Sequence, residues 1–210
     1  MKGILISIEG PDGAGKSTQI SLLQEYLKNK GYQSILTREP GGTSISEKIR
    51  SLILDKDNME MSSQTELLLY AAARAQLVQE VISPALKEGK VIICDRYVDS
   101  SAVYQGIARG LGIETVYEVN EYAIQKYWPD ITIHLDLDAE EGIRRKKNQT
   151  ELDRMELETI DFHKKVCEGY RTLAKRDPER IKTIDAMLSI EEIHEKIKQY
   201  LDDILERKHE

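Results

Sequence analysis

Cysteine, clustered histidine and long apolar runs are all scarce in this sequence. Its two cysteines, Cys94 and Cys167, lie far apart and form neither a CxxC pair nor a Cys/His spacing typical of metal sites. The longest apolar run, Leu67 to Ala73, has seven residues, far fewer than a membrane-spanning helix needs. The first nine residues show no cleavage site of a secretory signal. These absences argue against a disulfide-stapled or membrane protein and predict a cytoplasmic one with two idle thiols.

An excess of positive charge is also missing. The chain of 210 residues carries 30 Lys and Arg against 37 Asp and Glu, which gives a formal charge of −7. Such a balance argues against a protein that coats a nucleic acid polymer, although local basic patches are compatible with it. No repeat, low-complexity segment or linker divides the chain, and its length is sufficient to bury a full core. We therefore expect one domain over residues 1–210, with no nucleic acid polymer and no membrane as partner.

Short apolar runs alternate with helical stretches along the chain. Strands are predicted at residues 4–8, 33–37, 91–95, 131–135 and 181–184. Helical periodicity is found at 16–28, 45–54, 62–87, 114–126, 157–175 and 189–207, with a kink expected at Pro84. This alternation predicts an α/β fold, with a five-stranded parallel sheet and helices on both faces. Ligands of such folds lie beyond the carboxyl ends of the strands, so functional side chains are expected after Ile8, Thr37, Cys94 and Leu135.

A glycine-rich turn follows the first strand and opens the first helix. It reads GPDGAGKS over residues 10–17 and fits the G-x-x-x-x-G-K-[ST] pattern of a phosphate-binding loop. Its glycines let backbone N–H groups curl around phosphates, and the helix amino terminus adds partial positive charge. Lys16 is expected to reach the β- and γ-phosphates of ATP, and the Ser17 hydroxyl to bind Mg²⁺. The predicted ATP-binding residues are Gly10, Pro11, Asp12, Gly13, Ala14, Gly15, Lys16, Ser17 and Thr18.

The second half of a phosphate-loop site is an acid that ends a buried strand near the magnesium ion. Asp95 ends the third predicted strand in this way. Asp136, after the run Ile133 to Leu135, is a weaker candidate for the same role. Ser17 and Asp95 are therefore the predicted metal-binding residues.

Cations on the same sheet edge indicate a second pocket, for an anionic acceptor. Arg38 follows the second strand and Arg96 the third, and guanidinium groups hold phosphate oxygens bidentately. Tyr70 and Arg74 lie four residues apart on one helix face, where a ring and a guanidinium together suit a nucleotide base. Taken alone, this pair is more typical of a core tyrosine and a solvated arginine. The phosphate loop favours the ligand-binding interpretation.

A basic cluster, Arg144-Arg145-Lys146-Lys147, lies among acidic residues before Arg154. One interpretation is a solvated helix face, which most charge runs are. The other is a mobile lid over the nucleotide, which would exclude water and protect the phosphoryl donor from hydrolysis. Spacing alone favours neither.

The sequence resembles the bacterial thymidylate kinase (dTMP kinase) family over essentially its whole length. The matching segments are EGPDGAGKST at 9–18, TREPGGT at 37–43, LLLYAAARAQ at 67–76, DRY at 95–97, SSAVYQG at 100–106 and ELDRME at 151–156. The resemblance implies a P-loop fold and transfer of the γ-phosphoryl group of ATP to dTMP, which gives dTDP and ADP in dTTP synthesis. It also implies a homodimer.

The resemblance assigns roles in a dTMP pocket. Asp12 would hold the 3′-hydroxyl side of dTMP, while Arg38 and Arg96 would grip its phosphate. Tyr70 would stack on thymine, where the family often has Phe, and Arg74 would read the base edge. The remaining implied substrate-binding residues are Tyr97, which would crowd the sugar 2′ position, together with Ser101, Tyr104 and Gln105.

One departure from part of the family concerns catalysis. Some members carry an arginine within the phosphate loop, where this chain has Gly13. Members without it place the catalytic basic group in the lid, here at about residues 140–156. The implied catalytic residues are then Lys16 and Arg96, with Arg145 and Lys147 of the lid.

Other phosphate-loop proteins fit the sequence less well. A guanine-nucleotide switch normally carries N-K-x-D, and Asn29-Lys30-Gly31-Tyr32 lacks the acid. A motor ATPase usually needs a longer chain. The alternatives that stay open are another nucleoside monophosphate kinase and a non-catalytic nucleotide-binding module.

Overall fold

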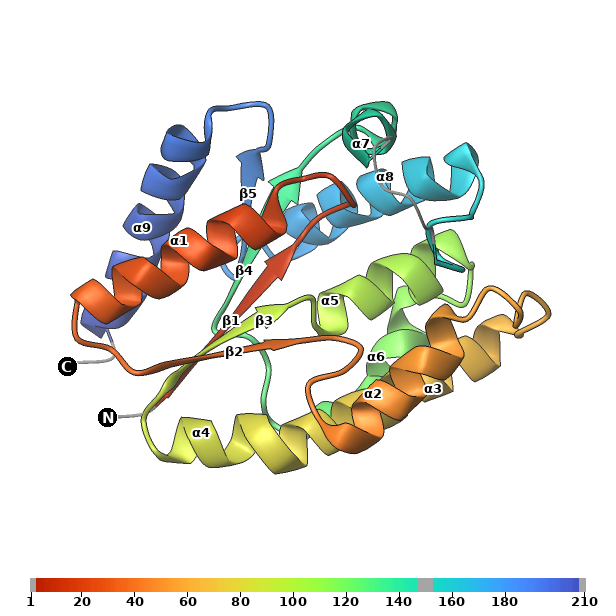
Figure 1. The fold of residues 1–210 in the computed structure, drawn as a ribbon, viewed down its shortest axis with the longest axis horizontal. Helices are drawn as coiled ribbons and strands as arrows, with labels where there is room; N and C mark the ends of the chain where they lie inside the picture. Colours follow the sequence, from red (N-terminus) through yellow and green to blue (C-terminus); the bar gives the residue numbers. More distant parts are fainter. Residues whose placement is uncertain (1–2, 147–152, 208–210) are drawn as a thin grey trace.

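The centre of the molecule is a five-stranded sheet with the order β2-β3-β1-β4-β5, in which every pair of neighbours is parallel (Figure 1). The computed structural model describes residues 3–146 and 153–207. The strands are β1 (Ile4–Glu9), β2 (Ser34–Arg38), β3 (Val91–Asp95), β4 (Ile131–Asp136) and β5 (Ile181–Asp185). The predicted parallel sheet is confirmed, and each strand begins and ends within one residue of its expected limit.

Helices cover both faces of the sheet, as predicted. On one face lie α1 (Lys16–Asn29) and α9 (Ile190–Arg207), whose apolar side chains share a core cluster with β1, β3 and β4 (Figure 1). The other face is covered by α3 (Ser63–Leu77), α4 (Ser83–Lys87), α6 (Ile113–Ile124) and α8 (Ile160–Arg176), and α2 (Ser44–Leu54) packs on α3. β1 is buried at all six positions, and its sequence is accordingly apolar on both faces except for Ser7 and Glu9.

The structure differs from the expected elements at residues 78–82 and 98–108, and it adds the helix α7 (Ala139–Lys146). The helix expected over 62–87 is divided by a π-helical turn, η1 (Val78–Ile82), directly before Pro84. Proline has no N–H to donate to the preceding turn, so the expected kink takes this form. Residues 98–108, for which no element was expected, form the short helix α5 (Val98–Ser101) and the π-helix η2 (Ala102–Ala108).

The carboxyl ends of the central strands meet at one edge of the sheet. Ile8 pairs with Asp95, and Arg38 of the neighbouring strand pairs with Asp95 from the other side. The phosphate loop leaves β1 at this edge, and the segment Arg96–Tyr97 leaves β3 beside it. Another helix, α7 (Ala139–Lys146), follows β4 at the same edge. Within residues 3–146 and 153–207, no helix is both long and apolar enough to cross a membrane.

Candidate active site

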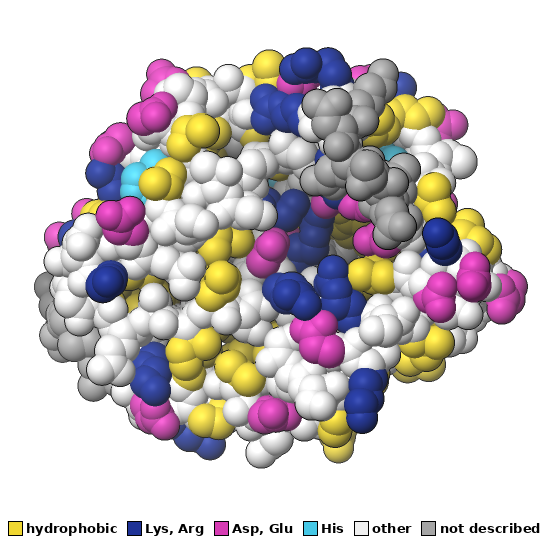
Figure 2. Space-filling model, viewed as in Figure 1, with side chains coloured by type: hydrophobic (Ala, Val, Ile, Leu, Met, Phe, Trp, Pro, Cys, Tyr) yellow, Lys and Arg dark blue, Asp and Glu magenta, His cyan; other side chains and the backbone are white. Residues whose placement is uncertain are grey.

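A cavity of about 530 Å³ opens at the carboxyl edge of the sheet. Its walls come from the phosphate loop, the ends of β2 and β3, the helices α2, α3 and η2, and residues 145–146 and 153–156. Figure 2 shows Lys and Arg side chains gathered in a hollow of this face. The predicted site residues that line the cavity are Asp12, Gly13, Gly15, Lys16, Ser17, Thr18, Arg38, Tyr70, Arg74, Asp95, Arg96, Tyr97, Ser101, Tyr104, Gln105 and Arg145. Functional residues were also expected after Leu135, but Asp136 instead forms an ion pair with Arg171.

The phosphate loop has the backbone that its glycines predict. Gly10, Gly13 and Gly15 all adopt positive φ angles, of 138°, 80° and 87°. At Gly10 there is also no room for a side chain, because a Cβ atom would lie 2.4 Å from the Leu135 carbonyl oxygen. The turn therefore depends on glycine both for its backbone conformation and for its close approach to β4.

Lys16 is buried at the start of α1 and folds back over the loop. Its Nζ atom donates to the carbonyl oxygens of Gly10 at 3.0 Å and Pro11 at 2.9 Å. Burial, together with repulsion from Arg96, lowers the pKa of Lys16 to about 8, against the attraction of Asp12. An anionic ligand in the cavity would favour the charged form of this amine.

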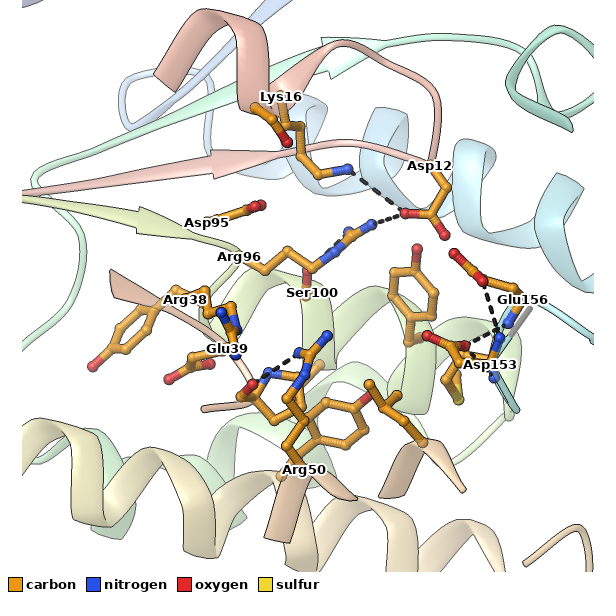
Figure 3. Close-up of a pocket in the computed structure, with 18 of the residues that line it drawn as sticks. Asp12, Lys16, Arg38, Glu39, Arg50, Asp95, Arg96, Ser100, Asp153 and Glu156 are labelled. Atoms are coloured by element: carbon orange, nitrogen blue, oxygen red, sulfur yellow. Dashed lines mark hydrogen bonds and ion pairs between the residues drawn. The ribbon is translucent and has the colours of Figure 1, made fainter. Parts of the chain in front are cut away.

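Arg96 and Asp12 form the centre of the cavity (Figure 3). The Nη2 atom of Arg96 donates to Asp12 Oδ1 at 2.8 Å, and its guanidinium lies 5.3 Å from the ring centre of Tyr104. Burial opposes ionisation of Asp12, but Arg96 and Lys16 outweigh it and hold the pKa of this carboxyl below its ordinary value. At neutral pH the pair is therefore a carboxylate and a guanidinium.

The predicted metal-binding residues fit a magnesium site. Ser17 and Asp95 both line the cavity, and Asp95 Oδ1 is buried without a hydrogen-bond partner among the described residues. No group of three or more His, Cys, Asp or Glu that could hold a metal occurs in the described part of the chain. The Asp95 carboxylate suits Mg²⁺, which is commonly held by one carboxylate, substrate phosphates and water.

Two arginines line the cavity at the end of β2. Arg38 is half-exposed, and its Nη2 atom donates to both carboxylate oxygens of Glu47, at 2.9 and 3.0 Å. Arg50, on α2, donates from Nη1 to the Pro40 carbonyl oxygen at 2.9 Å and points into the cavity (Figure 3). Sequence reasoning missed Arg50, because a single arginine on an amphipathic helix gives no sign of which way it points.

Arg74 is held more tightly than the sequence indicated. Only 1% of its surface is exposed, although it was expected as a solvated or base-reading residue. Its Nε atom donates to both oxygens of Glu39, at 3.0 and 2.8 Å, and its Nη1 atom donates to Asn120. Nη2 donates to the Ser101 hydroxyl at 3.1 Å. One wall of the cavity is thus an arginine fixed in orientation by its neighbours.

The three tyrosines of the predicted pocket lie in different surroundings. Tyr70 and Tyr104 line the cavity, and burial raises the pKa of both hydroxyls, so the two rings are neutral. Tyr97 also lines the cavity, but its ring belongs to the core cluster between sheet and helices, and its hydroxyl donates to the Tyr127 carbonyl oxygen at 3.1 Å. This placement leaves Tyr104 as the better candidate to crowd a sugar.

The basic cluster lies over the phosphate loop. Arg145 donates to the carbonyl oxygens of Gly13 and Ala186, each at 3.3 Å. Lys146 pairs with Glu156 and lies 3.6 Å from Asp12 Oδ2. Lys147, the other predicted catalytic residue of the lid, lies outside the described residues. The described part of the cluster therefore faces the cavity rather than solvent alone, except for Arg144, which is exposed and pairs with Glu141.

The sheet order, the glycine loop between β1 and α1, and the cation-lined cavity beside it define a phosphate-loop nucleotide-binding protein of the P-loop NTPase fold. Comparisons with known proteins make this specific. The family model described as thymidylate kinase matches residues 8–197. The chain belongs to the thymidylate kinase family.

Individual relatives agree over nearly the whole chain. A thymidylate kinase of Clostridium novyi is 50% identical over 202 residues, which cover 95% of this chain and 98% of that protein. One of Thermoanaerobacter sp. is 53% identical over 205 residues, with 96% and 100% covered. The crystal structure of thymidylate kinase from Ehrlichia chaffeensis superposes with a TM-score of 0.76 at 32% identity, and covers 96% of this chain and 99% of that one.

Proposed function

We propose that the cavity at the sheet edge is the active site of this chain, in which its residues bind ATP and dTMP and promote phosphoryl transfer. As a member of the thymidylate kinase family, the chain is an ATP-dependent kinase that transfers the γ-phosphoryl group of ATP to dTMP and gives dTDP and ADP. The observation that supports the site is the phosphate loop sharing one cavity with five arginines. The two alternative functions, another acceptor or binding without catalysis, are not favoured by these relatives.

The reaction needs alignment and charge neutralisation more than proton transfer. The attacking oxygen already belongs to the phosphate anion of dTMP, so no strong general base is required. Lys16 and the loop N–H groups hold the donor phosphates, while Arg96 lies between donor and acceptor and neutralises charge on the transferring group. Arg145 and Lys147 are the lid residues assigned to the same task. Closure of the lid, at about 140–156, excludes water.

The acceptor side holds dTMP by charge and by base shape. Arg38, Arg50 and Arg96 surround its phosphate, and Asp12 accepts from the 3′-hydroxyl. Tyr70 stacks on thymine and Arg74 donates to the base edge. The sugar wall is formed by Tyr104, with Ser101 and Gln105 beside it.

Ser17 and Asp95 would hold Mg²⁺, which would supply positive charge against the donor phosphates. Asp95 is suited to this by its unpartnered, buried oxygen.

The working form in this proposal is a homodimer in the cytoplasm. Neighbouring helices α3 and α6 carry exposed apolar side chains, with Leu68 59% and Tyr122 91% exposed. Covering such side chains with a second copy would remove apolar surface from water. Both cysteines are unpaired thiols, as is usual in a reducing compartment. A sedimentation mass near 24 kDa instead of twice that value would contradict the dimer.

The direct test is an ADP-release assay with dTMP, dUMP, UMP, CMP, AMP and GMP as acceptors. We expect turnover that depends on the acceptor and is fastest with dTMP. Preference for another nucleotide would reassign the substrate, and no turnover with any acceptor would favour a binding module.

Lys16→Ala and Arg96→Ala link this activity to the cavity. Each is expected to lower kcat by two or more orders of magnitude, because each removes a charge that is needed more in the transition state than in the bound state. Lys30→Ala is the control, since Lys30 pairs with Asp202 and does not line the cavity. Near-normal turnover of Lys16→Ala would overturn the site.

A further inference from the structure

Tyr170, on α8, is a buried residue that contacts Arg96 from behind the cavity wall and has no role in the proposed mechanism. Only 2% of its surface is exposed, and it does not itself line the cavity. Its ring stacks on His134 with centroids 5.1 Å apart and planes at 21°. The edge of Tyr104 packs on it at 6.4 Å. The ring is therefore held on two sides, which fixes the position of its hydroxyl.

That hydroxyl joins a guanidinium group and a buried carboxyl group. It accepts from Nη1 of Arg96 at 3.1 Å and donates to Oε2 of Glu9 at 2.9 Å. The Ser100 hydroxyl lies 2.8 Å away and donates to the same Glu9 oxygen at 2.6 Å. Burial raises the pKa of Tyr170 well above its ordinary value, so the phenol keeps the proton that it donates to Glu9. The Tyr170 hydroxyl thus connects the Arg96 guanidinium to Glu9, the buried acid that ends β1.

The contact divides the donors of Arg96 into two edges. Nη1 is satisfied by the Gly10 carbonyl oxygen at 2.9 Å and by the Tyr170 hydroxyl. Nη2 points to Asp12 in the cavity and has a second N–H, and Nε has no hydrogen-bond partner among the described residues. The inner edge, formed by Nη1, therefore binds protein. The outer edge, formed by Nε and Nη2, is presented to a ligand as a fork that matches two phosphate oxygens.

The backbone of Arg96 is strained, so contacts with neighbouring residues are needed to hold it in place. Its φ angle is 69°, a left-handed conformation that costs a non-glycine residue free energy. Glu9, fully buried, accepts from the Tyr97 backbone N–H at 2.7 Å and from the Ser100 hydroxyl, and so holds the segment that follows Arg96. The network of Glu9, Ser100 and Tyr170 thus stabilises Arg96 from its backbone and from its side chain.

We propose that Tyr170 is a positioning residue for phosphoryl transfer: its hydroxyl fixes the inner edge of Arg96 so that the outer edge faces the acceptor phosphate. This rests on the proposed role of Arg96 in binding dTMP. Tyr170 touches no substrate and acts through Arg96 alone. Removing its hydroxyl should therefore have no further effect once Arg96 is gone.

The test measures dTMP affinity by calorimetry in four proteins: the unchanged chain, Tyr170→Phe, Arg96→Ala and the double variant. We expect Tyr170→Phe to weaken dTMP binding about tenfold, and kcat/KM to fall by at least as much. In the Arg96→Ala background the same change should alter dTMP affinity less than twofold. The matched control is Tyr127→Phe, which removes a hydroxyl bonded to Ser83 outside the cavity and should leave affinity within twofold.

Distinct results separate this inference from the proposed function. If Arg96→Ala leaves dTMP affinity unchanged, the proposed role of Arg96 fails. If Arg96→Ala weakens binding but Tyr170→Phe does not, or if Tyr170→Phe costs tenfold in both backgrounds, the positioning role is overturned. Should Tyr170→Phe not fold, Ser100→Ala gives the same cycle, because it removes the other hydroxyl between Arg96 and Glu9; additive losses with Arg96→Ala would then contradict the proposal.

Discussion

Arg50 is the clearest candidate site residue that the structure adds to those expected from the sequence. It reaches the cavity from α2, with one guanidinium nitrogen bound to the Pro40 carbonyl oxygen and the rest directed inward (Figure 3). We predict that Arg50→Ala raises the KM for dTMP about ten- to a hundredfold, the loss expected for a hydrogen bond to a charged group. The KM for ATP should stay within threefold.

Steady-state kinetics with each substrate varied in turn measure both constants. Arg176→Ala is the matched control, because Arg176 pairs with Glu114 on the surface and does not line the cavity. Equal increases in the two KM values would mean that Arg50 does not belong to the acceptor side.

At this scale the sequence predicted the residues that stand in a motif and missed those that reach the site from a distant helix. Arg96 directly follows β3, and Lys16 ends the loop that follows β1, at the strand ends where the fold rule places ligands. Tyr170 and Arg50 lie on amphipathic helices, where a periodic pattern tells which face is buried but not which side chain meets a residue of another segment. Neither position carries a local signal of its role.

The contact between α7 and the phosphate loop depends on two glycines that face each other. A Cβ atom on Gly142 would lie 2.5 Å from the Asp12 carbonyl oxygen, and one on Gly13 would lie 2.6 Å from the Gly142 carbonyl oxygen. An arginine at position 13, as in some members of the family, would therefore collide with α7 in this arrangement. The helix α7 is therefore packed directly on the phosphate loop.

Gly142→Ala should consequently lower activity although alanine favours helices. Alanine in a helix is worth up to about 1 kcal/mol over glycine. A contact this short with backbone must push α7 away from the loop, at a cost of about 1–3 kcal/mol. Because Arg145 and Lys146 move with the helix, we expect kcat/KM for ATP to fall about tenfold or more and the melting temperature not to rise.

Glu140→Ala, on the exposed side of the same helix, is the control and should keep kcat/KM for ATP within twofold. A Gly142→Ala protein with higher stability and normal activity would show that α7 does not need this close approach.

The elements themselves were predictable to different degrees. The three central strands, β1, β3 and β4, are buried on both faces, so their mainly apolar sequences identify them within a residue. Residues 98–108 were missed because Gly106 interrupts the pattern and because a π-helix lacks the α-helical period. The segment matters, since it brings Ser101, Tyr104 and Gln105 to the cavity.

Over the whole molecule, the charge of −7 conceals how charge is distributed. Seven of the 30 Lys and Arg residues line one cavity, namely Lys16, Arg38, Arg50, Arg74, Arg96, Arg145 and Lys146. Several of them are paired with acids that phosphates would compete with, such as Asp12 for Arg96 and Glu47 for Arg38. The net charge argued against a protein that coats a nucleic acid polymer, but only the fold shows a cleft suited to small anions.

His134 couples the stability of the whole fold to pH. It is fully buried in β4 beneath Tyr170, and burial lowers its pKa to about 4 from an ordinary value near 6.5. Between these two values the unfolded chain binds a proton that the folded chain does not, so folding free energy contributed by neutral His134 is lost as pH falls from about 6.5 to 4. The shift corresponds to about 3 kcal/mol over that interval.

We therefore predict that urea unfolding at pH 7.5, 6.5, 5.5 and 4.5 gives a steeper loss of stability for the unchanged chain than for His134→Phe. Phenylalanine keeps an aromatic ring against Tyr170 but does not titrate. The variant also loses the contact with the Thr183 hydroxyl, which changes its stability at every pH and so does not affect the comparison of slopes. Parallel curves for the two proteins would mean that acid sensitivity arises from other groups, and that His134 accepts a proton in the folded core as readily as in the unfolded chain.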